Sequence, residues 1–123
     1  MDCVLWLRIA SALMFLAVAL GAFGAHALKN SLSPEHQAVF ETGVRYQVYH
    51  ALGILAAAWS LQQFQFRLAN SAAICFLAGI ALFSGSLYAL ALTGVRKFGM
   101  ITPVGGALFL AGWAILAFAP YKS

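Results

Sequence analysis

The sequence is poor in charged residues, and acidic residues are the rarest of them. Three of the 123 residues are Asp or Glu and seven are Lys or Arg, which is 8% of the chain, against about a quarter in a soluble domain. Hydrophobic residues make up 63%, and the mean hydropathy is +0.90. So few charges cannot cover the surface of a small domain in water. The composition excludes a water-soluble enzyme domain, a nucleic-acid-binding protein and a disordered chain, and it predicts a protein embedded in a lipid bilayer.

Cysteine is also scarce. The two cysteines, Cys3 and Cys75, are far apart in the sequence. Neither belongs to a CxxC pair or to a His/Cys spacing typical of zinc. We therefore expect no disulfide, no metal site and no cofactor, and we expect Cys75 to be a small packing residue in an apolar helix.

Long apolar runs account for most of the chain. A helix needs about 20 apolar residues to cross a hydrocarbon layer of about 30 Å, and none of the runs alternates with the period of two that marks a strand. The sequence predicts an all-α integral membrane protein: a single domain of residues 1–123 that forms an antiparallel bundle of four transmembrane helices. The expected helices cover about residues 9–28, 34–61, 69–93 and 102–119, and the second begins with an amphipathic stretch before its apolar part.

Local signals predict where these helices begin and end. Ser33 followed by Pro34 is typical of an N-cap and a first-turn proline. Thr102 and Pro103 repeat this pattern at the fourth helix, and Gly94 is a suitable stop for the third.

The first apolar segment also has the features of a secretory signal peptide. Arg8 precedes the apolar run, and small residues near Gly24 resemble a cleavage site. Its 20 apolar residues exceed a usual signal core, so we expect this segment to be retained as a transmembrane helix.

Positive charge does not predict the orientation in the membrane. The net charge is +4, and the Lys and Arg residues fall almost equally on the two predicted sides. Four crossings would place both termini on the same side. The two groups are Arg8, Arg67 and Lys122 on one side, and Lys29, Arg45, Arg96 and Lys97 on the other.

Most polar side chains that could take part in catalysis or ligand binding lie between residues 26 and 50. This stretch holds all three histidines and both glutamates. On a helix, Glu41 and Arg45 are four residues apart in the favourable order for an ion pair, and Tyr49 continues the same line. His50 lies on a different face, with Tyr46 beside it. The candidate site residues are therefore His26, Glu41, Arg45, Tyr46, Tyr49 and His50.

Each of these residues also has a structural explanation. Glu41 and Arg45 are expected to form a structural ion pair, buried with the rest of this polar stretch against the other helices and residues 29–42. His26 and His50 are expected at similar depth, where two histidines could bind a metal or haem. Because no third ligand pattern is present, hydrogen bonding is the better interpretation.

Several motifs, in order along the chain, resemble one known family. They read GAFGAHAL at 21–28, FETGVRYQVYHAL at 40–52, FSGSLY at 83–88 and ITPVGG at 101–106. Together they resemble the YgdD/YwdK-like small membrane proteins. The resemblance implies a multi-pass protein of the bacterial inner (cytoplasmic) membrane, carries no catalytic residue, and implies no established biochemical role.

Two classes of function agree with these features. The first is a non-enzymatic membrane module that binds a lipid, a small ligand or a membrane protein partner through the residues near His26, Glu41, Arg45 and His50. The second is a small transporter or channel that works as a homo-oligomer, because four short helices alone leave little room for a pathway. The first is preferred, since no carboxylate lies inside the first membrane helix. An enzyme is not expected, because no nucleophile is paired with a base.

Overall fold

The described residues, 2–122, fold into helices that are almost continuous from end to end in this computed structural model. Short connections separate the helical segments. In chain order, the elements are α1 (Cys3–Val18), the π-helical η1 (Ala19–Gly24), α2 (Ala25–Leu28), α3 (Pro34–Phe64), α4 (Ala69–Gly79), the π-helical η2 (Ile80–Ser84), α5 (Gly85–Thr93), the 3₁₀-helical η3 (Arg96–Met100) and α6 (Thr102–Ala117).

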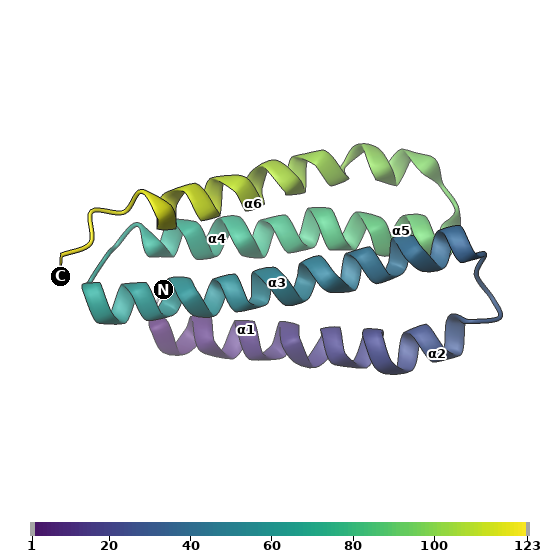
Figure 1. The fold of residues 1–123 in the computed structure, drawn as a ribbon, viewed down its shortest axis with the longest axis horizontal. Coiled ribbons are helices and arrows are strands. Elements are labelled where there is room, and N and C mark those ends of the chain that lie inside the picture. Colours follow the sequence, from purple (N-terminus) through teal and green to yellow (C-terminus); the bar gives the residue numbers. More distant parts are fainter. Residues whose placement is uncertain (1, 123) are drawn as a thin grey trace.

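The helical segments lie side by side along the long axis of the molecule (Figure 1). α3 packs against α1 on one side and against α4 and α5 on the other, and α6 packs against α4 and η2. α1 and α6 therefore flank the central pair formed by α3 and α4.

Three segments are long and apolar enough to cross a membrane: Cys3–Leu28, Ala69–Thr93 and Arg96–Ala117. This agrees with three of the four predicted spans. α3 is longer than any of them, at 31 residues, but its polar side chains lower its hydropathy. The first segment begins at Cys3 and not near residue 9, and α3 continues to Phe64.

Helix boundaries follow the local signals with one exception. Ser33 caps α3, where its hydroxyl accepts a hydrogen bond from the His36 N–H at 3.1 Å. Gly94 ends α5 with a φ of 73°, the left-handed conformation that favours glycine. The predicted cap at Thr102 is wrong: its hydroxyl lies 2.6 Å from the Ser86 hydroxyl and links α6 to α5 instead.

The two π-helical segments, η1 and η2, are absent from the sequence-based prediction. Each widens a long apolar helix for about one turn, as π-bulges do. Ser84, the last residue of η2, donates a 2.6 Å hydrogen bond to the Gly43 carbonyl of α3. Ser84 therefore links η2 to α3, whereas the Ser86 hydroxyl donates to the Phe83 carbonyl of the preceding turn at 2.9 Å.

Glycines set the close approach of α6 to α4 and η2. A Cβ at Gly105 would lie 2.5 Å from the backbone nitrogen of Phe83, and one at Gly79 would lie 2.5 Å from the Phe109 ring. A Cβ at Gly112 would lie 2.6 Å from the ring of Phe76. Small residues are what close helix packing in lipid requires, since lipid chains are as apolar as the packed side chains.

Candidate functional site

The six predicted site residues do not converge. They separate into three places: an exposed position near the end of the first segment (His26), the outer face of α3 (Glu41 and Arg45), and a groove between α3 and α6 (Tyr46, Tyr49 and His50). Helix α3 presents Glu41 and Arg45 on one face and Tyr46 and His50 on another, as their spacing predicted, so the six residues do not form one polar cluster.

His26 and His50 lie at different depths. Gly24 faces Phe40, and His50 lies ten residues further along α3, or about 15 Å at 1.5 Å per residue. His26 is exposed, whereas His50 is 5% exposed. The expected common depth is not found, and the two histidines cannot share a ligand.

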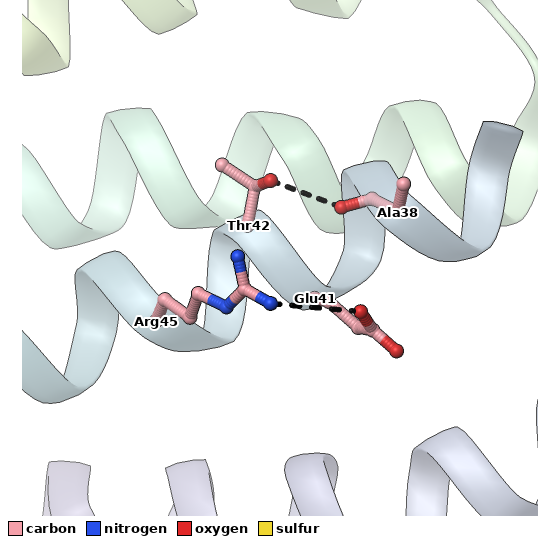
Figure 2. A network of polar contacts seen from close by, with 4 residues as sticks. All are labelled: Ala38, Glu41, Thr42 and Arg45. Carbon is pink, nitrogen blue, oxygen red and sulfur yellow. Dashed lines mark hydrogen bonds and ion pairs between the residues drawn. The ribbon is translucent and has the colours of Figure 1, made fainter.

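Glu41 and Arg45 form the predicted ion pair on the outer face of α3. Arg45 Nη2 and Glu41 Oε2 are 4.0 Å apart, and the side chains are 65% and 48% exposed. Figure 2 shows both on the same side of the helix, while the neighbouring Thr42 hydroxyl donates to the Ala38 carbonyl at 3.0 Å. The expectation that this pair is buried against other helices is wrong.

An open groove of about 650 Å³ runs between α3 and α6. α3 contributes Tyr46, Tyr49 and His50 to its lining, and α6 contributes Phe109 and Trp113. The remaining lining residues are also apolar or small: Phe83, Pro103, Gly106, Ala107 and Leu110.

The imidazole of His50 lines this groove, and both of its ring nitrogens form hydrogen bonds. Trp113 Nε1 donates to His50 Nε2 at 3.0 Å, and His50 Nδ1 lies 2.8 Å from the Tyr46 carbonyl. Because an indole N–H is only a donor, Nε2 must be the acceptor, and Nδ1 carries the proton that it donates to Tyr46. The ring stacks on Phe109 with centroids 3.5 Å apart and planes 6° from parallel.

These contacts give His50 a structural role in the groove. A neutral imidazole with one nitrogen donating and the other accepting has no lone pair left for a metal ion. Within residues 2–122, no group of three or more His, Cys, Asp or Glu side chains is placed to hold a metal.

A second buried polar link joins α1, α3 and α5. The Gln47 amide donates to the Leu13 carbonyl at 2.7 Å, and its carbonyl oxygen accepts from the Tyr88 hydroxyl at 2.7 Å. Gln47 is 3% exposed. The sequence could indicate that the Gln47 amide needs hydrogen-bond partners in an apolar segment. It could not identify those partners, because they lie on other helices.

The comparisons with known proteins identify a family of membrane proteins. Residues 20–106 match the family described as "Protein of unknown function (DUF423)". The chain belongs to this family. It is 47% identical over 111 residues to a UPF0382 membrane protein of Haemophilus influenzae, covering 89% of this chain and 87% of the relative.

Two further relatives carry the names that the sequence motifs pointed to. The UPF0382 membrane protein YwdK of Bacillus subtilis (strain 168) is 42% identical over 108 residues, which cover 87% of this chain and 88% of the relative. The UPF0382 inner membrane protein YgdD of Escherichia coli (strain K12) is 43% identical over 102 residues, which cover 83% and 78%. No solved structure gives a significant match.

The family resemblance is therefore confirmed, and so is the location. Relatives from different bacteria are named membrane proteins, one of them an inner membrane protein. Together with the three apolar helices, this identifies a multi-pass protein of the bacterial inner (cytoplasmic) membrane.

Proposed function

We propose that this family member is a non-enzymatic membrane module that binds one apolar, lipid-like molecule in the groove between α3 and α6. The observation that carries the proposal is the groove itself, an open space of about 650 Å³ lined almost entirely by aromatic and aliphatic side chains. Ligand pockets in proteins commonly measure about 300–1,000 Å³ and share this lining.

The chemistry of the groove supports binding. Its two nitrogen-bearing side chains, His50 and Trp113, are hydrogen-bonded to one another. Tyr46 and Tyr49 line the groove and are 36% and 51% exposed, so the phenol rings offer stacking surface and hydroxyl groups to a ligand. A molecule with an apolar body and a small polar head fits this combination.

We further propose that α3 is a fourth membrane span, which completes an antiparallel bundle. Its length of 31 residues corresponds to about 46 Å, more than a hydrocarbon layer requires. Its position between α1 and α4, with connections at alternating ends and both termini at one end of Figure 1, supports the arrangement.

The bundle predicts the location of the chain ends. Reporter proteins fused to the N-terminus and to the C-terminus are expected to report the same side of the membrane. Reporters on opposite sides would exclude the fourth span.

Ligand binding is tested by filling the groove. Ala107 lines the groove, whereas Ala111, one helical turn further along α6, is exposed outside it. We expect Ala107→Trp to reduce the fraction of protein that retains a lipid adduct in native mass spectrometry about tenfold, a loss of about 1.4 kcal/mol of binding. Ala111→Trp is the matched control and should retain the adduct. Equal retention by both variants, or no adduct on the native protein, would contradict the proposal.

A further inference from the structure

The outer face of α3 is a row of exposed side chains with both charges on it. It comprises Glu41, Arg45, Leu52 and Trp59, which follow one another along one side of the helix, and Tyr49 lies between this row and the groove. These side chains stay exposed because α3 packs against α1, α4 and α5 through its other sides.

The two charges lie deeper than the ends of the neighbouring apolar helices. Val44 faces Gly21, seven residues before the first segment ends at Leu28, and Gly43 faces Tyr88, five residues before α5 ends at Thr93. At 1.5 Å per residue, Gly43 and Val44 are about 8–10 Å inside those ends, and Arg45 follows them along α3. Given the four-span arrangement proposed above, an Arg45 side chain that is 65% exposed faces hydrocarbon.

This position is unusual within the described residues. The other Asp, Glu, Lys and Arg side chains lie in connections or in the first two turns of a helix, where they reach water or lipid headgroups. Charged side chains at membrane depth are costly when they face lipid, and they normally lie against protein and pair with an opposite charge. Glu41 and Arg45 are 4.0 Å apart and about half exposed, so the intrahelical pair offsets little of the cost of placing either charge in lipid.

We infer that a second copy of this chain covers the outer face of α3 and forms a symmetric dimer. The charge pattern is self-complementary, since an acid and a base lie one turn apart on the same face. A two-fold axis along the membrane normal keeps each residue level with its copy, so Glu41 of each chain lies about 6 Å along the axis from Arg45 of the other, within reach of an arginine side chain. Two reciprocal ion pairs then replace two weak intrahelical ones, and Leu52 and Trp59 supply apolar contact.

Cross-linking in membranes tests the position of the interface. In a chain carrying Cys3→Ser and Cys75→Ala, Leu52→Cys places a thiol on the outer face. Phe15→Cys is the control, since Phe15 is 75% exposed on α1. Oxidation is expected to give about tenfold more disulfide-linked dimer from Leu52→Cys than from Phe15→Cys. A monomer in which Arg45 reaches lipid phosphates would give equal, low yields and overturn the inference.

Charge variants test the proposed pairing. In the Leu52→Cys chain, Glu41→Arg makes the face entirely basic and Arg45→Glu makes it entirely acidic. Each variant alone is expected to give about tenfold less disulfide-linked dimer than the Leu52→Cys chain, because like charges then meet at the interface. Co-expression of the two, distinguished by tags, should restore dimer between unlike copies, which also shows that both variants are folded. Undiminished dimer from either variant alone, or no recovery on mixing, would overturn the inference.

The dimer and the ligand groove are separable. Ala107→Trp alters the groove and leaves the outer face of α3 intact, so it should not change the cross-linking. In the native protein, a lipid adduct without cross-linked dimer would show that the dimer proposal fails, and cross-linked dimer without a lipid adduct would show that the ligand proposal fails.

Discussion

Replacing Gly105 with alanine is expected to destabilise the folded protein by about 3 kcal/mol, the upper part of the usual range for overpacking. The added Cβ would lie 2.5 Å from the backbone nitrogen of Phe83 and 2.9 Å from the carbonyl oxygen of Gly79. Backbone atoms in a packed helix cannot rotate away, so α6 must move away from α4 and η2. Unfolding by sodium dodecyl sulfate in mixed micelles, followed by circular dichroism, measures the change.

Gly106 provides the matched control. It is the next residue on the same helix, but the nearest atoms to its added Cβ are 3.9 Å away, in the ring of Phe83. Gly106→Ala is therefore expected to change stability by less than about 0.5 kcal/mol. Equal effects of the two substitutions would show that α6 does not pack as closely as described.

The second large effect is expected at Phe76. This side chain is fully buried and lies between Gly53 and Gly112, with its ring centroid 4.7 Å from that of Trp113. In a soluble core, Phe→Ala costs about 3–5 kcal/mol. In a membrane, the free energy of transferring the side chain from water to the protein interior no longer contributes in full, because lipid is as apolar as the protein interior. The lost packing remains, so we expect about 3 kcal/mol for Phe76→Ala.

A double-mutant cycle checks that this cost arises from the stated contact. Gly112→Ala places a Cβ 2.6 Å from the Phe76 ring and should be destabilising on its own. In the Phe76→Ala background it should be nearly neutral or stabilising, because the added methyl enters the vacated space. Additive effects of the two substitutions on the free energy of unfolding would show that the Phe76 ring does not pack against residue 112. Phe15→Ala, at a position 75% exposed to lipid, is the control and should have little effect.

Composition and local signals were sufficient for much of the fold. The scarcity of charge predicted the membrane, and the apolar runs predicted the three helical segments that are long and apolar enough to cross it. The Ser33–Pro34 and Gly94 signals placed helix ends correctly. The π-helical turns and the role of Thr102 could not be predicted, because they depend on contacts with neighbouring helices. Ser84, for example, finds its acceptor on α3 and not on its own helix.

The candidate site was predicted in part. Helical spacing identified the Glu41–Arg45 pair and the neighbourhood of Tyr46 and His50. Helical spacing also placed these two groups on different faces, but it could not predict which face is exposed and which lines a groove, because that depends on where the other helices pack. Phe109 and Trp113 carried no signal in so apolar a chain, yet they form the opposite wall of the groove.

The measurement that tests the central proposal most directly is photocrosslinking inside the native membrane. A photoreactive benzoylphenylalanine at Leu110 lies in the groove, whereas the same residue at Phe15 faces bulk lipid from α1. Mass spectrometry of the cross-linked protein should give one dominant adduct of lipid-like mass at Leu110 and a mixture in proportion to the membrane lipids at Phe15. The same mixture at both positions would contradict a ligand-binding groove.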